Sequence, residues 1–378
     1  MKFFVKTFGC VQNTADSQRI RFFYLNKGYE EVKNWKETNL VVINSCIVRE
    51  SAENRVYGLI NEIDKYNREK NDNKEFKNKK EKIKIIVTGC LAGLANKNKS
   101  KLKQLKKDFP TVSDFMPIEK ISFEIKPLRD NKDMALIPIS FGCSNFCSYC
   151  IVPFARGQEQ SRKMEDILKE IDEVINQGFK KVMLIGQNVN SYLDPKSLIS
   201  PSLSERDKTK YVVHMGKKRF QSSFPKLLEE VAKRDLEKIS FVSSNPWDFS
   251  DELVEVIAKY KNIDRLLHLP FQAGDDEILK KMNRGYTFDE YLELTNKIKS
   301  KIPDVRLSTD IIIGFPGEDE KAFQKTVDLC KKVGFEIAYL NKYSPRKGTV
   351  SAKIYKDDIP MSEKKRRWNV LNDLINKK

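Results

Sequence analysis

The chain has 378 residues, of which 40% are hydrophobic, and it carries a formal net charge of +17. That length is enough for two or three globular domains. The absence of any apolar run of transmembrane length, and of a signal-peptide pattern after Met1, predicts a soluble cytosolic protein with no membrane partner. The positive charge predicts attraction to a polyanion, nucleic acid before an anionic membrane, although the Lys- and Asn-rich composition accounts for part of it.

Three short strands, each followed by a cysteine, are predicted in the amino-terminal third. Residues 3–7, 40–44 and 83–88 are apolar runs that end near Cys10, Cys46 and Cys90. Helical stretches follow each of them, at 13–26, at 49–65 and after residue 90. Strands that alternate with helices form a parallel sheet, and parallel strands end at one edge. We therefore expect a three-thiolate site there, although a buried structural role is the ordinary interpretation of any one of these cysteines.

Two irregular stretches suggest how the chain is divided. Residues 67–82 are charged and Asn-rich, which predicts a solvated loop or a helix extension. Residues 110–133 contain three prolines and are predicted to be a linker. We accordingly predict a first domain at 1–115, a linker at 116–133, a second domain at 134–360 and a terminal helix or truncated linker at 361–378.

A second group of thiols follows the strand predicted at 134–140. Cys143, Cys147 and Cys150 have the spacing Cys-x3-Cys-x2-Cys. Thiolates select zinc, copper(I) or iron-sulfur clusters, and structural zinc normally has a fourth protein ligand, which this segment lacks. A four-iron cluster that leaves one iron open to a cofactor fits better, with Phe146 and Tyr149 as shields. A zinc knuckle or three unrelated cysteines are the alternatives.

The rest of the chain continues the alternation of strands and helices. Further strands are predicted at 181–185, 239–242, 265–269, 306–313 and 336–341, with amphipathic helices such as 165–176 and 320–332 between them. Together with the strand at 134–140 these make six strands, which predict a partial (β/α)6 barrel with its site at the carboxyl ends of the strands. Residues 194–223 interrupt the pattern and are predicted to be a mobile surface loop. We assign Cys330, within the last of these helices, to the core.

Longer strings now identify a resemblance, which extends from residue 3 to about residue 351. TFGCVQNTADS, INSCIVRESAENR, VTGCLA, SFGCSNFCSYC and PFARGQEQSR resemble the cysteine motifs of the radical S-adenosylmethionine (SAM) methylthiotransferases. GQNVNSY, HLPFQAGDDEILKKMNRGYT, DIIIGFPGE and YSPRKGT resemble the members that make 2-methylthio-N(6)-isopentenyladenosine in tRNA. The chain departs from the family at Val11-Gln12 and at Asn245, where many members have histidine. We expect no carboxy-terminal RNA-binding TRAM barrel, which is usual in the family, because the sequence ends soon after Tyr355; either this member lacks the barrel or the sequence is incomplete.

The resemblance implies an α/β protein with two [4Fe-4S] clusters. An amino-terminal three-layer α/β domain would hold the auxiliary, sulfur-donating cluster on Cys10, Cys46 and Cys90. A TIM-like partial barrel would follow, with the SAM-cleaving cluster on Cys143, Cys147 and Cys150. Contacts to SAM are expected at the strand ends, from Gln187, Asn188, Ser243, Asn245 and Gly314, for each of which an ordinary cap or turn is the alternative. We expect Gly314 and Gly317 to let the backbone approach the adenine closely, and Glu318 to be the first-turn acid of the next helix.

The implied reaction uses two SAM molecules. One methylates a sulfide on the auxiliary cluster, and the other gives the radical that activates carbon 2 of the adenine. The implied partners are the tRNA anticodon stem-loop, a reductant such as flavodoxin or ferredoxin, and a sulfur donor, acting on a monomeric enzyme. We expect the prenyl group of the substrate near Phe271 and Tyr343, and RNA contacts from the inserted loop at Lys208, Lys210, Lys217, Lys218 and Arg219.

Three alternatives remain open at this stage. In the first alternative the chain is a methylthiotransferase for threonylcarbamoyl-adenosine or for a ribosomal-protein aspartate; the strings GQNVNSY and YSPR argue against this alternative. It is a non-catalytic iron-sulfur redox or sensor protein, or a basic RNA-binding module. SAM cleavage and iron analysis separate the last two from an enzyme.

Overall fold

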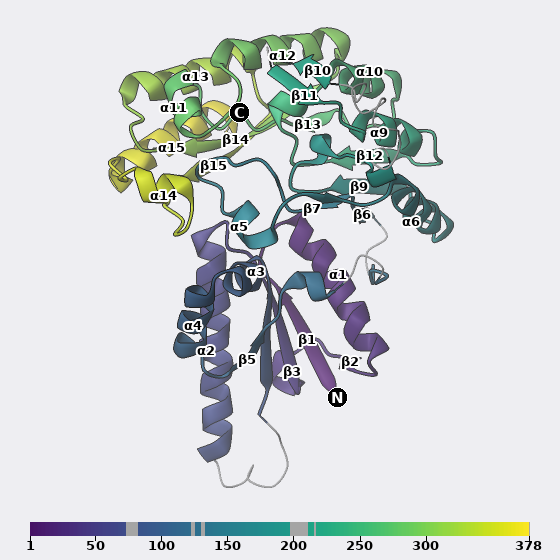
Figure 1. Cartoon of the computed structure of the whole chain (residues 1–378), viewed down its shortest axis with the longest axis vertical. Coiled ribbons are helices and arrows are strands. Elements are labelled where there is room, and N and C mark those ends of the chain that lie inside the picture. Colours follow the sequence, from purple (N-terminus) through teal and green to yellow (C-terminus); the bar gives the residue numbers. More distant parts are fainter. Residues whose placement is uncertain (73–81, 122–124, 130–132, 197–210, 215–216, 378) are drawn as a thin grey trace, which may run out of the picture. The chain divides into compact units, whose positions relative to one another are not determined.

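The chain forms two compact units. The computed structural model describes all residues except 73–81, 122–124, 130–132, 197–210, 215–216 and 378 (Figure 1). The first unit contains Met1–Asp130 and Ile151–Gln158, and the second contains Asn131–Cys150 and Glu159–Lys378. The predicted terminal segment at 361–378 therefore belongs to the second unit.

This division differs from the predicted one after residue 115. Residues 116–130 of the stretch expected to be a linker are part of the first unit, and Met116, Ile118 and Ile121 are buried in one of its cores. A short segment beyond Cys150 also belongs to the first unit, because Ile151 and Ala155 are buried in its other core.

The first unit is built on a five-stranded parallel sheet with the order β2-β1-β3-β4-β5 (Figure 1). The central strand β3 is buried at every position, as expected for a parallel strand that is covered on both faces. The strands of the first unit are β1 (Lys2–Thr7), β2 (Glu30–Glu31), β3 (Leu40–Ser45), β4 (Lys84–Gly89) and β5 (Val112–Phe115). The helices of this unit are α1 (Val11–Asn26), α2 (Glu50–Asp72), α3 (Cys90–Lys97), α4 (Lys99–Asp108) and α5 (Val152–Arg156). Short 3-10 turns lie at Trp35–Glu37 and Ile118–Lys120.

The three predicted strands of this unit are confirmed, and two more are present. β2 has only two residues, and β5 lies in the stretch predicted to be irregular. Both middle positions of β5 are exposed, so its apolar pattern is too weak to indicate a strand. Helix α2 continues to Asp72, which confirms the predicted helix extension for residues 67–72, and residues 73–81 lie outside the described part of the chain.

The second unit contains the six predicted parallel strands. They form two three-stranded sheets with the orders β12-β9-β6 and β13-β14-β15, and a parallel bridge between Ile239 and Ile263 lies between them. The strands are β6 (Ala135–Pro138), β9 (Lys181–Ile185), β12 (Lys238–Phe241), β13 (Leu266–His268), β14 (Arg306–Ile313) and β15 (Ile337–Lys342).

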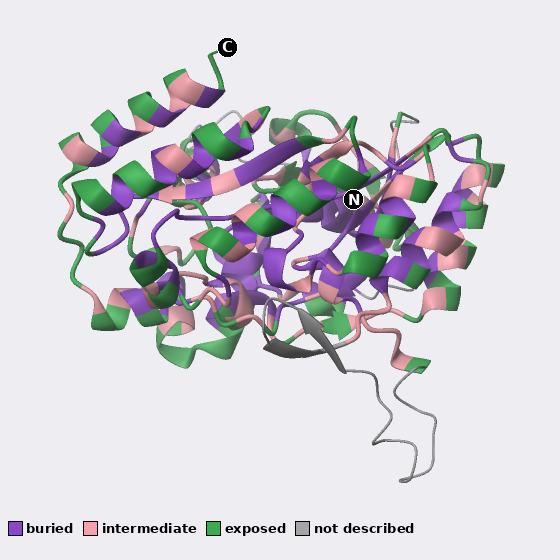
Figure 2. Ribbon diagram, turned by 90° about the horizontal axis from the view of Figure 1, so that it is seen from above, coloured by how far each residue is buried: buried purple, intermediate pink, exposed green. Residues whose placement is uncertain are grey.

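Helices connect these strands and cover them. Buried and exposed residues alternate along the helices, as expected for amphipathic helices packed on a sheet (Figure 2). Helix α6, for example, buries Ile167, Ile171 and Val174. The helices are α6 (Met164–Asn176), α9 (Phe224–Ala232), α10 (Asp251–Lys259), α11 (Asp276–Lys281), α12 (Phe288–Lys301), α13 (Glu320–Val333), α14 (Val350–Ile354) and α15 (Met361–Ile375), and 3-10 turns lie at Val189–Ser191 and Pro246–Asp248.

Two short antiparallel pairs complete the unit. β7 (Ser140–Phe141) pairs with β8 (Gln160–Ser161). β10 (Tyr211–His214) pairs with β11 (Lys217–Phe220), so the prediction of a loop throughout 194–223 is wrong for this hairpin. The expected RNA contacts Lys208 and Lys210 lie outside the described residues.

The core of the second unit contains the two rings expected near the prenyl group of the substrate. Phe271 is fully buried and stacks on Phe335, and Tyr343 packs against Phe315. Both rings are thus part of the core, and the expected prenyl pocket near Phe271 and Tyr343 stays a prediction. Cys330 is buried in the same core, which confirms its assignment. No helix of the described chain is long and apolar enough to cross a membrane.

Candidate functional site

The three single cysteines of the first unit lie at one edge of its sheet. β3 and β4 are paired as far as Ser45 and Gly89, so Cys46 and Cys90 are the next residues of adjacent strands. Cys10 follows β1 and is the N-cap residue of α1. Burial raises the pKa of Cys90, and electrostatic interaction with Cys46 and Cys10 adds to the rise, as expected for three neighbouring thiols.

A buried amide network supports this edge. The Asn13 side chain donates to Asn44 Oδ1 at 3.0 Å and to the Ser45 carbonyl at 3.2 Å, and it accepts from the Cys10 backbone at 3.3 Å. Gly89 has φ +81°, and a Cβ at this position would collide with Asn44 Oδ1. A glycine is therefore required immediately before Cys90.

A buried ion pair reaches one of the three thiols. Arg156 Nε donates to Cys90 Sγ at 3.1 Å, and Arg156 Nη2 donates to Asp16 Oδ2 at 2.8 Å. The side chains of Arg156 and Asp16 are each 2% exposed. Gln12 donates to Asp16 Oδ1 at 3.2 Å. The sequence analysis missed Arg156 and Asp16.

Helix α1 held a signal that could have indicated this site. Its buried positions are largely polar rather than apolar, and Gln12 and Asp16 are four residues apart on one face. A helix that buries polar side chains in a globular domain normally does so for a structural or binding reason, because each such group needs a partner.

The residues at this edge fit an iron-sulfur cluster. Burial raises the pKa of Cys90 to about 11, so its thiolate needs a metal to displace the proton. Among the described residues, three buried polar atoms here have no hydrogen-bond partner: Gln12 Oε1, Thr88 Oγ1 and Arg156 Nη1. Polar atoms of this kind are explained by a group that occupies the site.

The described residues contain no group of three His, Cys, Asp or Glu side chains arranged to hold a single metal ion. A mononuclear zinc site would need its thiolates about 2.3 Å from one ion. In a cubane each thiolate binds a different iron, so the sulfurs stand farther apart. The arrangement of both thiol groups is compatible with clusters in this respect.

The cysteine loop of the second unit is held by the residues that follow α11. Ser148 donates to the end of α11, through its backbone to the Met282 carbonyl at 2.9 Å and through its hydroxyl to the Lys281 carbonyl at 2.7 Å. The Asn283 side chain donates to the Phe146 carbonyl at 2.8 Å. Cys147 and Cys150 are joined by a backbone hydrogen bond of 2.9 Å. The loop that carries the three thiols is therefore anchored from outside.

A half-buried arginine also reaches this loop. Arg284 Nη1 donates to Cys147 Sγ at 3.4 Å, and its guanidinium lies over the rings of Trp247 and Tyr286. Burial raises the pKa of Cys143 to about 12, so this thiol too needs a metal to ionise. Phe146 is 56% exposed, and of the two predicted shields only Tyr149 packs against the core.

Four of the predicted SAM contacts lie at the ends of β9 and β12. Asn190 ties these ends together, since it donates to the Asn245 carbonyl at 2.9 Å and accepts from the Asn245 backbone at 2.8 Å. Ser243 has φ +68°, a strained conformation for a residue other than glycine. Gln187 is half-buried beside Asn188, and the fifth predicted contact, Gly314, ends β14 in the other sheet.

Unpaired acceptors mark the ends of β9 and β12. In the described part of the chain, Asn188 Oδ1, Asn245 Oδ1 and Ser244 Oγ are buried without a hydrogen-bond partner. Asn188 Nδ2, in contrast, donates to Asp248 at 2.8 Å. The two orphaned amide oxygens need a donor, which a ligand with amino or hydroxyl groups would supply.

Two carboxylates that the sequence analysis missed accompany these acceptors. The Ser191 hydroxyl lies 2.8 Å and 2.7 Å from the carboxylate oxygens of Glu159, and the Glu159 backbone donates to Ser144 Oγ at 3.2 Å. Burial raises the pKa of Glu159 to about 7, and the nearby charge of Asp248 adds to the rise. A bound cationic group would favour the ionised form of both carboxylates.

Glu318 corrects another prediction. Helix α13 begins at Glu320 and is capped by Asp319, so Glu318 is not a first-turn acid. Its buried carboxylate accepts from the Gly314 backbone at 2.6 Å and from Arg367 Nη1 of α15 at 3.0 Å. Burial raises the pKa of Glu318 to about 7, while Gly314 and Arg367 favour the ionised form. Glu318 instead stabilises its own loop through these buried hydrogen bonds.

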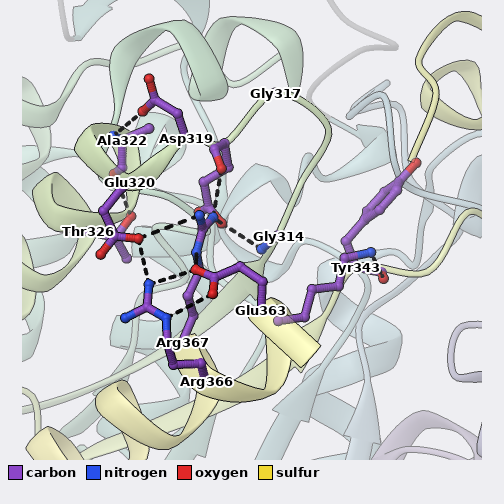
Figure 3. A network of polar contacts seen from close by, with 12 residues as sticks. Gly314, Gly317, Asp319, Glu320, Ala322, Thr326, Tyr343, Glu363, Arg366 and Arg367 are labelled. Atoms are coloured by element: carbon purple, nitrogen blue, oxygen red, sulfur yellow. Dashed lines mark hydrogen bonds and ion pairs between the residues drawn. The ribbon is translucent and has the colours of Figure 1, made fainter. Parts of the chain in front are cut away.

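Helix α15 closes over this loop. It packs against β14 and β15, and Figure 3 shows its residues Glu363, Arg366 and Arg367 in the polar network that includes Gly314. Gly314 has φ +70°, and a Cβ there would collide with the Lys364 side chain. The space that a Cβ on Gly314 would need is therefore taken by Lys364 of α15.

Comparisons with known proteins agree with this arrangement. Residues 137–330 match the family model described as Radical SAM superfamily, and residues 2–112 match that described as Uncharacterized protein family UPF0004. A tRNA-2-methylthio-N(6)-dimethylallyladenosine synthase of Thermotoga petrophila is 39% identical over 100% of this chain and 83% of its own length. One of Geobacillus kaustophilus is 36% identical over 99% of this chain and 69% of its own length.

A solved structure shows the likeness of fold. The radical S-adenosylmethionine methyltransferase TsrM from Kitasatospora setae has a TM-score of 0.57 to this chain at 12% identity, covering 93% of this chain and 77% of that one. At such low identity only the fold is compared, whereas the full-length relatives share sequence throughout. The chain therefore belongs to the radical SAM superfamily and, within it, to the family of the tRNA-2-methylthio-N(6)-dimethylallyladenosine synthases.

Proposed function

We propose that this protein is a tRNA methylthiotransferase that converts N(6)-isopentenyladenosine next to the anticodon to 2-methylthio-N(6)-isopentenyladenosine. The observation that carries the proposal is the presence of two separate three-cysteine sites, each at the carboxyl ends of parallel strands in its own unit. The names of the full-length relatives support the substrate, since dimethylallyl and isopentenyl denote the same five-carbon substituent here.

The second unit would hold a [4Fe-4S] cluster on Cys143, Cys147 and Cys150 and bind SAM beside it. When bound, these groups supply the one-electron chemistry that activates an unreactive C–H bond. The acceptors of Asn188 and Asn245, with the carboxylates of Glu159 and Asp248, suit a ligand that carries an ammonium and ribose hydroxyls. We assign Gln187 and Ser243 to the same ligand by position, and the Gly314 backbone to its adenine.

The first unit would hold the auxiliary cluster on Cys10, Cys46 and Cys90. The chain has three thiols there and no fourth, so one iron would stay open for the sulfur that is transferred. An external reductant, such as flavodoxin or ferredoxin, and a sulfur donor are required by the stoichiometry of the reaction. We propose that the enzyme is a monomer.

A first test concerns the substrate. A short anticodon stem-loop that carries isopentenyladenosine should be methylthiolated, and the same stem-loop with plain adenosine should give little product. The target base must leave its stack to reach the site, and a single-stranded loop makes this inexpensive. The measurement is mass spectrometry of the nucleosides after reaction with the reconstituted enzyme.

The matched control is the stem-loop with threonylcarbamoyl-adenosine. Equal rates on the prenylated and plain stem-loops would reject the isopentenyladenosine assignment, and a preference for the control would make threonylcarbamoyl-adenosine the substrate. Nucleoside analysis of tRNA from cells that lack the gene answers the same question in vivo.

A second test concerns how tRNA is held. With a net charge of +17, binding should rest largely on contacts to phosphates. For 6–10 such contacts the affinity would fall by about 10³- to 10⁵-fold between 50 mM and 200 mM salt. Fluorescence anisotropy of labelled tRNA at increasing salt measures the slope. A flat response would contradict this mode of binding.

A further inference from the structure

Arg156 is fixed inside the first unit by its own helix. The helix α5 packs against α3 so closely that a Cβ on Gly93 would collide with the Ala155 carbonyl. Lys97 of α3 donates to the same carbonyl at 3.2 Å. Ile151 and Ala155 share a buried core with Cys90. The guanidinium is therefore carried to Cys90 by packed backbone, not by a mobile loop.

The contacts of Arg156 place a buried positive charge against one cluster ligand. Its Nε donates to Cys90 Sγ at 3.1 Å, and Asp16 accepts from its Nη2 at 2.8 Å. Its remaining group, Nη1, is buried and has no partner among the described residues. An inorganic sulfide or a thiolate is an acceptor that this N–H could use.

Hydrogen bonds to sulfur and local charge are among the factors that set the potential of an iron-sulfur cluster. Reduction adds an electron to a cluster that already carries thiolates, so a donor and a cation at Cys90 stabilise the reduced state. Asp16 has the opposite effect, because its carboxylate offsets the charge of Arg156. The ion pair thus contains one element that raises the potential and one that lowers it.

We propose that Arg156 is a positioning residue that raises the reduction potential of the auxiliary cluster through Cys90, and that Asp16 limits the rise. This inference rests on the proposed function, specifically on a cluster at Cys10, Cys46 and Cys90. Arg156 touches a cluster ligand and acts on the cluster through it.

The experiment isolates one cluster in the full-length chain. Cys143, Cys147 and Cys150 are all replaced by alanine, so that reconstituted protein should carry about four irons in a single cubane. Arg156→Gln, Arg156→Lys, Asp16→Asn and Lys97→Gln are then added separately. A potentiometric titration followed by electron paramagnetic resonance gives the midpoint potential of each.

Arg156→Gln should move the midpoint to more negative potential, and Asp16→Asn should move it to more positive potential. Arg156→Lys keeps the charge without the two-pronged geometry, so its midpoint should lie between those of wild type and Arg156→Gln. Lys97→Gln, which removes a cation that contacts α5 but not Cys90, should leave the midpoint in place. Opposite shifts at Arg156 and Asp16 are not expected from a purely structural ion pair, whose two partners would fail alike.

Equal midpoints in all variants, or shifts of the same sign for Arg156→Gln and Asp16→Asn, would overturn the inference. If Arg156→Gln fails to retain iron, Arg156→Lys and Asp16→Asn decide, and an unmoved midpoint in Asp16→Asn rejects it. A parent protein that binds no cluster at all would instead contradict the proposed function.

Discussion

Cys147→Ala should abolish reductive cleavage of SAM, whereas Cys46→Ala should keep cleavage and lose the methylthiolated product. Cys147 and Cys46 belong to different units of the structure, and each is one of three thiols available to its own cluster. Removing one of three ligands leaves a cubane with only two protein ligands, so we expect the affected activity to fall below detection. The measurement is 5′-deoxyadenosine and methylthiolated nucleoside after reduction with dithionite.

Iron content checks the same separation without activity. The wild-type protein should carry about eight irons, and each single variant about four. Cys330→Ala is the matched control, because Cys330 is buried in the core of the second unit, apart from either group of three. It should retain both activities and all the iron. Equal loss of SAM cleavage in Cys147→Ala and Cys46→Ala would sink the division of roles.

Arg367→Met should destabilise the second unit by about 3–5 kcal/mol at pH 8, the cost of leaving one partner of a buried ion pair without the other. The Arg367 side chain is 4% exposed and donates to both the carboxylate and the backbone carbonyl of Glu318. Met preserves much of the side-chain volume, so the loss reports on the charge. Urea unfolding followed by tryptophan fluorescence measures it, since Trp247 and Trp368 lie in this unit.

The adjacent arginine of α15 supplies the control. Arg366 is 48% exposed and pairs with Glu320 and Glu363 at the surface. Arg366→Met should therefore cost about 0–1 kcal/mol. A similar loss in the free energy of unfolding for the two variants would show that the buried ion pair contributes no more to stability than the exposed one.

The pH dependence of this difference has a definite sign. The pKa of Glu318 in the folded protein is raised to about 7, so its carboxyl accepts a proton below that pH. Only the ionised form requires Arg367. The cost of Arg367→Met should thus be smaller at pH 6 than at pH 8. A cost that is independent of pH would mean that Glu318 does not ionise in this range.

The sequence by itself determined the chain order of nine parallel strands, three in the first unit and six in the second, and the positions of the six candidate cluster cysteines. β3 begins with an apolar run and β14 ends with one, and a short polar or glycine-containing segment follows each run, a local signal that needs no knowledge of the fold. Because parallel strands end at one edge, the same signal predicted that Cys10, Cys46 and Cys90 lie together. The spacing of Cys143, Cys147 and Cys150 is local as well.

Only the tertiary structure decided which charged residues serve these sites. Arg156 contacts Cys90, which is 66 positions away in the sequence, and Asp16, which is 140 positions away. No periodic pattern links residues at such sequence separations. Glu318 has the sequence context of a first-turn acid, but burial under α15 turned it toward Gly314 and Arg367. β2 and β5 are strands only because the sheet pairs them, since two residues or two exposed middle positions leave almost no apolar pattern. Local patterns therefore placed the cysteines, and packing between distant segments placed the charges around them.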